Sequence, residues 1–476
     1  MEKGKQIKRS FLTSEVDMTS GNLFGKMILY ALPILLTTVL QLLYSTVDLI
    51  SVQKWGGGDT SMGSIAANGA LINLIIVVFN NISLGANVCI ANAKGAGDRE
   101  KANKILHTSM LFSITSGFFV GFVGFALSDN FLRLMGTEEA YLDLATLYLK
   151  IYFVGLPFLM IYNYASQNLR AVGDSKSPFI ILLISGIINV IVDFIFVKYL
   201  KLDVAGVAWA TVISEGISSI LSIIYLFSNK KGYIYLKINE LKIDKKVLKE
   251  IVKVGLPAGF QGFFFSLPNV FIQASLYTID PGNINLSNGA IASGQIESYI
   301  YAGINAISVT TMSFISSNMG AKLTNNMKKV FLYSMIINFI YYGIVCIIVI
   351  TLNHQILSLF LSSDVAIKYG RQRLFLLAFT YFFDGLMDIS GSSLRGVKYS
   401  TYPMITTLIF CTGLRILFVE TLFKVDMFHT LTWLYMIMPI SWILSTICNF
   451  IGRATIIPKI YKNIESTKGN NTLATA

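Results

Sequence analysis

Two polar side chains interrupt the apolar stretch from Pro178 to Lys198. Asn189 and Asp193 lie four residues apart in it, so both would lie on one face of a helix. The stretch is long enough to cross a bilayer as a helix, and a carboxylate at mid-membrane costs about 2.5 to 3.5 kcal/mol on insertion scales. A carboxylate retained at that cost is typical of a functional site that faces a polar cavity.

A second acidic residue of this kind is Asp48, deep in the apolar stretch 24–52. Two carboxylates held close together in low-dielectric surroundings can take up and release a proton near neutral pH. The same oxygens, with amide and hydroxyl oxygens beside them, could instead coordinate Na⁺. For Asp193 a structural ion pair with Lys198, five residues further on, is a further alternative.

Other ionisable residues also fall inside apolar stretches. We expect Glu297 and Glu420 to lie at the membrane interface, near the ends of their helices. For the Arg415 side chain we expect either an intramembrane ion pair or a functional role as a cation. The remaining members of the group are Glu215, Asp384 and Asp388.

Membrane helices must position these residues, because 54% of the 476 residues are hydrophobic and only 13% are charged. The sequence predicts an all-α integral membrane protein with twelve transmembrane helices. Grouping the apolar runs places them at about 24–52, 64–92, 104–127, 142–170, 178–198, 204–228, 250–279, 286–318, 327–351, 366–394, 402–423 and 429–452.

Lysine and arginine predict the orientation of these helices. The segments on one side, which include both termini, carry 28 of these residues and the segments on the other side carry eight. The positive-inside rule therefore predicts that both termini are cytoplasmic. The first 18 residues are polar, and no cleavable signal peptide is expected there.

Short motifs recur at a nearly constant distance along the chain. Two homologous halves of six spans are therefore predicted, related as parallel repeats with a substrate cavity between the two lobes. The predicted segments are a tail at 1–23, an N-lobe at 24–228, a basic linker at 229–249, a C-lobe at 250–452 and a tail at 453–476. The paired motifs, 224 or 225 residues apart, are Leu32-Pro33 with Leu256-Pro257, Gly95-Ala96 with Gly320-Ala321, Leu169-Arg170 with Leu394-Arg395, and Pro178 with Pro403.

Signatures of enzymes and of ATP-driven pumps are missing. The sequence has no HExxH, no GxSxG and no glycine-rich loop ending in GK[ST], so we expect no catalysis, no cofactor and an ion gradient as the energy source. The four cysteines and three histidines lack the spacing of metal ligands. The net charge of +12 fits cytoplasmic loops, and no nucleic-acid partner is expected. The lysine-rich linker is expected either along the membrane interface or as a solvated basic loop.

Several motifs in their order and spacing resemble the multidrug and toxic compound extrusion (MATE) transporters, in particular their bacterial DinF-like and NorM-like branches. The resemblance extends from about Gly21 to about Pro458. The motifs that carry it are Leu32-Pro33, Val47-Asp48, Gly95-Ala-Gly-Asp98, Leu169-Arg-Ala-Val-Gly-Asp174, Asn189-x-x-x-Asp193, Gly206-Val-Ala-Trp-Ala-Thr211 and Leu394-Arg-Gly396.

The resemblance implies an exporter with two six-helix lobes around a central cavity, which works by alternating access coupled to inward H⁺ or Na⁺. NorM-like members add an acidic pair in the second lobe; Asp384 matches one member, but Phe265 stands where the family has a glutamate. Asp384 and Asp388 are assigned to the substrate cavity. The matching positions for the cation site of DinF-like members are Asp48, Asn189 and Asp193, with Tyr148, Asn163 and Thr211 as polar neighbours.

The primary hypothesis is thus an antiporter that acts as a monomer in the bacterial inner membrane and exports amphipathic, cationic small molecules. Its partners would be the organic substrate and the lipid bilayer, with Na⁺ as the one metal ion considered. One alternative is a lipid-linked oligosaccharide flippase of the same superfamily, which would favour a cationic cavity. Another is a membrane sensor or scaffold, which would leave the duplication and the intramembrane acids unexplained.

Overall fold

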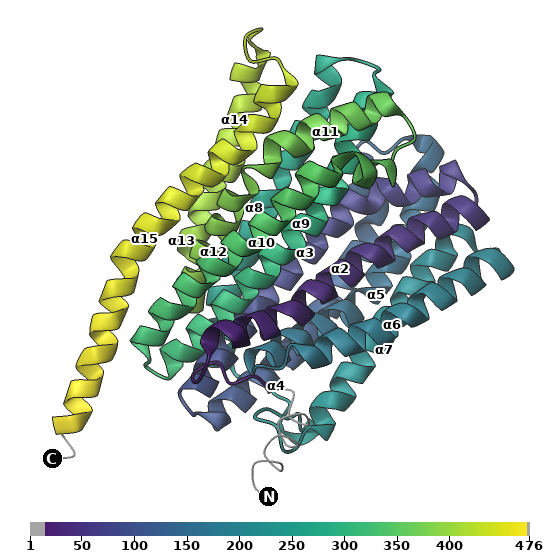
Figure 1. The fold of residues 1–476 in the computed structure, drawn as a ribbon. Helices are drawn as coiled ribbons and strands as arrows, with labels where there is room; N and C mark the ends of the chain where they lie inside the picture. Colours follow the sequence, from purple (N-terminus) through teal and green to yellow (C-terminus); the bar gives the residue numbers. More distant parts are fainter. Residues whose placement is uncertain (1–14, 474–476) are drawn as a thin grey trace, which may run out of the picture. The chain divides into compact units, whose positions relative to one another are not determined.

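A computed structural model gives the fold and describes residues 15–473. Within this range every regular element is helical and no strand occurs (Figure 1). The first six spans are α2 (Leu23–Trp55), α3 (Asp59–Gly95), α4 (Arg99–Leu134), α5 (Glu139–Ala171), α6 (Lys176–Asp193) with the π-helix η1 (Phe194–Tyr199), and α7 (Asp203–Ser228).

The second six spans follow a linker that contains the short 3₁₀-helix η2 (Ile238–Glu240). Two of these spans are composite, and a second 3₁₀-helix, η4 (Leu422–Lys424), precedes the last one. The six are α8 (Lys245–Ile279), α9 (Ile284–Gly320), α10 (Thr324–Ser358), α11 (Asp364–Ala378) with α12 (Tyr381–Gly396), α13 (Thr401–Thr406) with the π-helix η3 (Thr407–Leu414) and α14 (Arg415–Glu420), and α15 (Leu431–Leu473).

Length and composition identify these helices as membrane spans. Nine in the described range are long and apolar enough to cross a membrane, and α11 with α12, bent by 50°, forms a tenth. Helices α8 and α9 are as long but more polar. Large rings are exposed on the helix surfaces, as at Phe119, Phe122 and Phe339, which are 69%, 75% and 66% exposed. Such surfaces suit contact with lipid, and the predicted all-helical membrane fold is confirmed.

Side-chain caps mark the starts of two spans. The Lys101 N–H donates to the Asp98 side chain at 2.9 Å, so α4 begins directly after Asp98. The Leu286 N–H donates to Asn283 at 3.1 Å at the start of α9. The turn between α3 and α4 requires Gly97, whose φ of 75° lies in the left-handed region.

The chain folds into two compact units. Within the described residues, the N-terminal unit comprises residues 15–18 and Leu32–Leu256, and the C-terminal unit comprises Thr19–Ala31 and the residues from Pro257 to 473. Two of the three division points, before Leu32 and before Pro257, fall at the repeated Leu-Pro motif. Helix α2 therefore supplies its first residues to the C-terminal unit, and α8 supplies its first residues to the N-terminal unit.

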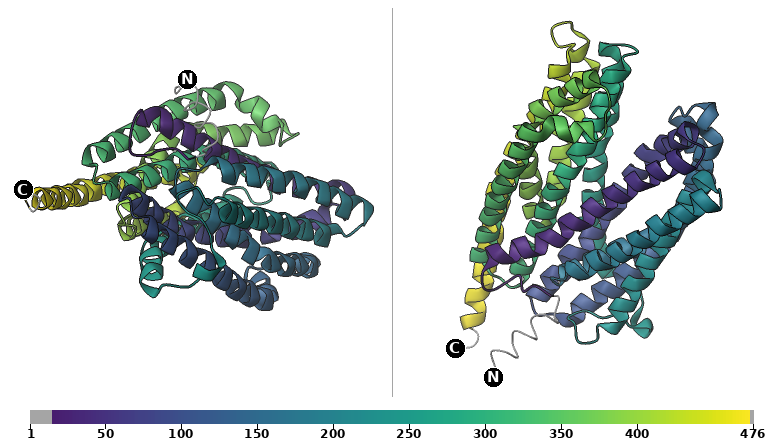
Figure 2. Two further views of the ribbon diagram at one scale, coloured as in Figure 1. Left: turned by 90° about the horizontal axis from the view of Figure 1, so that it is seen from below. Right: turned by 45° about the vertical axis from the view of Figure 1, so that its right-hand side comes forward.

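Each unit has its own central helix. In the N-terminal unit, α5 packs against α3, α4 and α7, and a Cβ on Gly117 of α4 would lie 2.8 Å from the Cα of Pro157 in α5. In the C-terminal unit, α9 packs against α10, α11 and α12, and α12 packs against α15. Helix α15, yellow in Figure 2, is the longest element of the described chain.

The linker is packed against the N-terminal unit. Ile234, Leu236, Val247 and Ile251 are buried in its hydrophobic core, whereas most of the linker lysines are exposed. The apolar side chains of the linker and of the start of α8 are thus covered by protein.

Candidate functional site

Three helices of the N-terminal unit bring acidic side chains together. The Asp48 carboxyl of α2 lies within hydrogen-bonding reach of Asp193, at the end of α6, and of Thr211 in α7. Asp48 is 9% exposed and Asp193 is fully buried. Asp48 Oδ1 and both Asp193 oxygens have no hydrogen-bond donor among the described residues. Two carboxyls in this arrangement need a shared proton or a bound cation between them.

A glycine sets the close approach of α2 and α6 beside this pair. A Cβ on Gly186 would lie 1.7 Å from Cζ of Tyr44, and the Tyr44 hydroxyl donates to the Leu182 carbonyl at 3.2 Å. Asp48 lies one turn after Tyr44, and Asn189 and Asp193 follow Gly186 on α6. The contact of the Tyr44 ring with Gly186 therefore places the carboxyls of two helices at one level.

Asp193 is the last residue of α6 before the chain continues as a π-helix. Such wide turns occur frequently at functional sites. Lys198, on the π-helix, does not pair with Asp193, because its amine lies 4.5 Å from the ring centre of Phe194 and near the rings of Trp55 and Tyr199. The alternative of a structural ion pair for Asp193 is thus wrong.

The remaining residues predicted for this site lie at different distances from the carboxyl pair. Tyr148 is buried close enough to Asp48 and Asp193 to interact electrostatically with both. Thr211 Oγ1 also donates to the Val207 carbonyl at 3.1 Å. Asn189 is 3% exposed, and no donor among the described residues reaches its Oδ1. Asn163 is buried, but within the described chain no hydrogen bond joins it to the carboxyls.

Glu215 belongs to the same cluster, although the sequence alone assigned it no role. It lies one turn after Thr211 in α7 and interacts electrostatically with Asp48, Tyr148 and Tyr152. A Cβ on Gly155 would lie 2.9 Å from Glu215 Oε2, so the glycine makes room for this carboxylate. The spacing of four from Thr211 was the signal that could have identified it, because it places both side chains on one helical face.

We call Asp48, Asp193 and Glu215 the N-terminal acidic cluster. No lysine or arginine of the described chain forms an ion pair with any of the three. Two buried carboxyls and one half-buried carboxyl without a compensating protein cation favour a positively charged ligand.

The acids of the C-terminal unit have basic neighbours. Asp388 accepts a hydrogen bond from the Tyr301 hydroxyl at 3.1 Å and lies near the guanidinium of Arg395. Asp384 is 2% exposed and lies near Asp388 and Arg415, although its Oδ1 has no hydrogen-bond donor in the described range. Asp384 and Asp388, both predicted for the substrate cavity, thus lie close together. The positive charges of Arg395 and Arg415 lie near their carboxyl groups.

The interfacial position predicted for Glu297 is wrong. Glu297 is paired with Arg373 through two hydrogen bonds of 2.6 and 2.8 Å, and the two side chains are only 12% and 11% exposed. The pair joins α9 to α11, which bury a charged residue each because the partner satisfies it. Glu420 does lie exposed, paired with Lys424 at 2.8 Å.

Arg415 is fully buried at the start of α14, directly after the π-helix η3. Its Nε donates to Ser441 Oγ at 2.8 Å, and its guanidinium lies 5.6 Å from the ring of Phe265 and 5.7 Å from that of Trp442. Phe265, at the position where the resemblance placed a glutamate, therefore contacts a cation. No carboxylate contacts either terminal nitrogen of Arg415 within the described residues.

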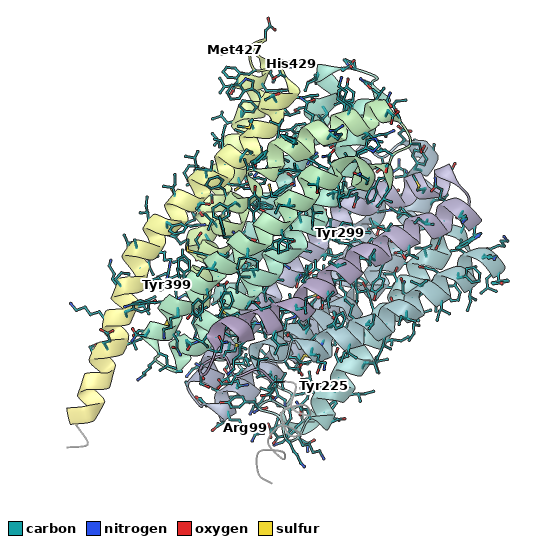
Figure 3. All side chains as sticks on the ribbon, viewed as in Figure 1. Arg99, Tyr225, Tyr299, Tyr399, Met427 and His429 are labelled. Carbon is teal, nitrogen blue, oxygen red and sulfur yellow. The ribbon has the colours of Figure 1, made fainter. Side chains whose placement is uncertain are left out.

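No cluster of three histidine, cysteine, aspartate or glutamate side chains suited to a metal ion occurs in the part of the chain that the structure describes. Figure 3 shows the side chains on both units; Arg99 and Tyr225 mark one end of the N-terminal unit. The Tyr225 hydroxyl donates to Asp174 Oδ2 there at 2.8 Å.

Comparison with known proteins identifies the family. The family model described as MatE matches this chain twice, over residues 33–195 and 257–419. The chain belongs to the MatE family. The two MatE matches are 224 residues apart, which confirms the internal repeat. MatE proteins are transport proteins rather than enzymes.

Curated relatives carry names that refer to drugs. A probable multidrug resistance protein, YoeA of Bacillus subtilis (strain 168), is 26% identical over 401 residues, covering 83% of this chain and 86% of the relative. The multidrug export protein MepA of Staphylococcus saprophyticus is 23% identical over 382 residues, covering 78% and 82%.

Solved structures share the fold. A MATE crystal structure in complex with MaL6 matches with a TM-score of 0.86 and 20% identity, covering 94% of this MatE chain and all of the other. A MOP superfamily transporter from Pyrococcus furiosus matches with a TM-score of 0.85 and 20% identity, covering 94% and 99%. This MatE chain is accordingly a multi-pass membrane protein.

Proposed function

We propose that this chain is a secondary antiporter that exports amphipathic, cationic small molecules in exchange for H⁺ or Na⁺ by alternating access. The N-terminal acidic cluster carries the proposal, because its two buried carboxyls and the half-buried carboxyl of Glu215 form no ion pair with a lysine or arginine of the described chain. A chain that keeps such a cluster in the membrane needs a mobile cation to neutralise it.

Coupling follows from competition for these carboxyls. A proton or Na⁺ bound between Asp48 and Asp193 cancels charge that would otherwise attract a cationic substrate, so the two ligands weaken each other's binding. If each favours a different conformation, entry of the ion shifts the population toward the state that releases substrate. Tyr148, Asn163, Asn189 and Thr211 would supply the neutral oxygens of the site, and Asp384 and Asp388 would contact substrate in the other unit.

The distribution of basic residues supports an orientation with both termini in the cytoplasm, in the cytoplasmic membrane of a bacterium. The relatives named for multidrug resistance and multidrug export support drug-like substrates. We infer that one chain suffices, since both repeats are present in it.

The decisive test is Asp48→Asn in everted membrane vesicles that transport the monocation ethidium under an imposed proton gradient or an imposed Na⁺ gradient. We expect the substitution to abolish uptake driven by the coupling gradient, because the Asp48–Asp193 pair loses one of its two carboxyl groups. Asp143→Asn is the matched control, since Asp143 of α5 is exposed and forms no ion pair within the described residues. Gradient-driven transport at the unsubstituted rate in Asp48→Asn would refute the proposal.

A further inference from the structure

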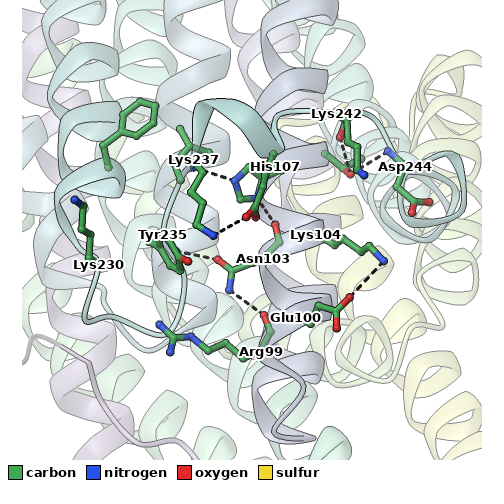
Figure 4. Close-up of a pocket in the computed structure, with 14 residues that line it drawn as sticks. Arg99, Glu100, Asn103, Lys104, His107, Lys230, Tyr235, Lys237, Lys242 and Asp244 are labelled. Carbon is green, nitrogen blue, oxygen red and sulfur yellow. Dashed lines mark hydrogen bonds and ion pairs between the residues drawn. The ribbon is translucent and has the colours of Figure 1, made fainter.

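A cavity of about 1020 Å³ opens where the linker crosses the start of α4 (Figure 4). One wall is a single face of α4, from Arg99 to Thr108. The other wall is formed by Phe227 at the end of α7 and by linker residues from Lys230 to Asp244. The whole cavity belongs to the N-terminal unit, and it is separate from the acidic cluster.

Side chains one helical turn apart on α4 hold the linker backbone and so fix the cavity. Arg99 donates to the carbonyls of Gly232 and Tyr233 at 2.6 and 3.1 Å. Asn103 Oδ1 accepts from the Tyr235 N–H at 3.0 Å, and His107 Nε2 accepts from the Lys237 N–H at 3.0 Å. Because these contacts repeat along the helix, the linker lies as an ordered strap and the cavity wall is preformed.

Basic groups predominate in the lining. Five basic side chains face three acidic ones, and each acid is already engaged. Glu100 pairs with Lys104 at 3.7 Å. Lys237 pairs with Glu240 and lowers the pKa of that carboxyl below its usual range. The backbone N–H groups of Val247 and Lys246 likewise lower the pKa of Asp244, which caps the start of α8.

Three cations of the lining therefore have no carboxylate partner among the described residues, and these are Arg99, Lys230 and Lys242. Lys230 and Lys242 are exposed, and the Arg99 guanidinium lies 5.8 Å from the ring of Tyr235. Backbone carbonyls hold the Arg99 guanidinium, so of these three cations Lys230 and Lys242 are the ones available to a ligand. Together with the Tyr235 ring and the apolar Phe227, they fit an anion that carries an apolar portion.

We propose that this cavity binds a phosphate-bearing anion, namely the headgroup of an anionic phospholipid in the leaflet next to the linker. Lys230 and Lys242 lie on different sides of the cavity (Figure 4), and their positive charge would attract the phosphate into it. The location supports a lipid source, because the cavity lies at the ends of two membrane spans, and basic pockets at such positions attract anionic headgroups. This inference needs the membrane orientation proposed above but not the transport mechanism.

The test is a titration of phosphatidylglycerol or phosphatidylcholine into the detergent-solubilised full-length chain, with bound lipid counted by native mass spectrometry. We expect phosphatidylglycerol to bind more tightly than phosphatidylcholine. Lys230→Gln with Lys242→Gln should weaken phosphatidylglycerol binding by roughly tenfold, since each lysine contributes electrostatic attraction at a lipid surface.

Lys231→Gln with Lys249→Gln is the matched control, because it removes the same charge from exposed linker positions that do not line the cavity. It should change binding less than about twofold. Equal losses in the two double variants, or equal affinity for the two lipids, would overturn the proposal and indicate a solvated basic loop. A competing arm uses inorganic phosphate: displacement of the lipid by millimolar phosphate would support a phosphate site but assign it to water-soluble ligands. Because no gradient is applied, these outcomes are independent of the transport test.

Discussion

The two units share a sequence repeat but differ in whether their buried acidic side chains have basic neighbours. In the N-terminal unit Asp48, Asp193 and Glu215 have no protein cation to balance them. In the C-terminal unit three acids have three arginines for neighbours: Arg373 pairs with Glu297, and Arg395 and Arg415 lie near Asp388 and Asp384. We infer that the paired charges of the C-terminal unit stabilise its fold, whereas the carboxyls of the N-terminal acidic cluster remain available to a ligand.

The fifth span of each repeat shows the contrast most directly. Both spans contain a π-helix, η1 after Asp193 in one and η3 before Arg415 in the other. The wide turn is therefore common to both units, whereas the buried charge beside it is negative in one and positive in the other. The two repeats thus share the geometry of the fifth span but differ in the charge beside the π-helix.

The largest effect is expected from Arg373→Met in the C-terminal unit. Removing one partner of a buried ion pair leaves Glu297 uncompensated, which costs about 3 to 5 kcal/mol in the free energy of unfolding. Denaturant unfolding of the purified protein measures this cost. The double variant Glu297→Met with Arg373→Met is the control and should regain most of the stability; a single variant as stable as the unsubstituted chain would remove the basis of the comparison.

Asp193→Asn in the N-terminal unit should impair transport without lowering stability. We expect gradient-driven ethidium transport to fall at least about tenfold, while the unfolding temperature stays the same or rises because an unpaired buried carboxyl is replaced by a neutral amide. Transport in proteoliposomes and thermal unfolding are measured on the same preparation. A loss of stability as large as that of Arg373→Met would mean that Asp193 is structural.

The helix contact beside the acidic cluster gives an intermediate effect. Gly186→Ala forces a methyl group into the Tyr44 ring, and overpacking of this kind costs about 1 to 3 kcal/mol. Gly216→Ala is the control, because nothing lies within 4 Å of a Cβ there. Gly303→Ala tests the other unit, where the Cβ would lie 2.1 Å from Cζ of Tyr341. The comparison predicts similar stability losses but a transport defect mainly in Gly186→Ala.

The smallest effect is expected from Glu215→Gln, which tests the charge of the cluster. The dication propidium should lose about fivefold in transport rate relative to the monocation ethidium, corresponding to roughly 1 kcal/mol for one solvated charge pair. The fluorescence of the two dyes follows their transport in vesicles. An unchanged ratio would show that Glu215 does not face the substrate.

The sequence predicted what depends on composition and on short motifs. Hydropathy gave the helical spans, and the Leu-Pro motifs gave the repeat that the family model confirmed. Asp48 and Asp193 could be grouped because of the family resemblance, and the structure places them side by side. The Glu297–Arg373 pair could not be predicted, since its members lie 76 residues apart and Glu297 alone suggested a helix end. Glu215 lies one turn after Thr211, but its electrostatic neighbours Asp48 and Tyr148 are distant in the sequence. The strap over α4 depends on backbone contacts that composition does not encode.

The exchange of helix ends at the Leu-Pro motifs bears on how the gene can be divided. A cut in the linker would give a first fragment that lacks residues 245–256 of its own unit, and a second fragment that lacks Thr19–Ala31 of its unit. Neither product would therefore contain a complete unit, although each would contain a complete sequence repeat. Function from two half-genes would therefore require that both fragments are expressed in the same cell. An ancestral single-repeat protein with this fold would have had to complete each unit by dimerising.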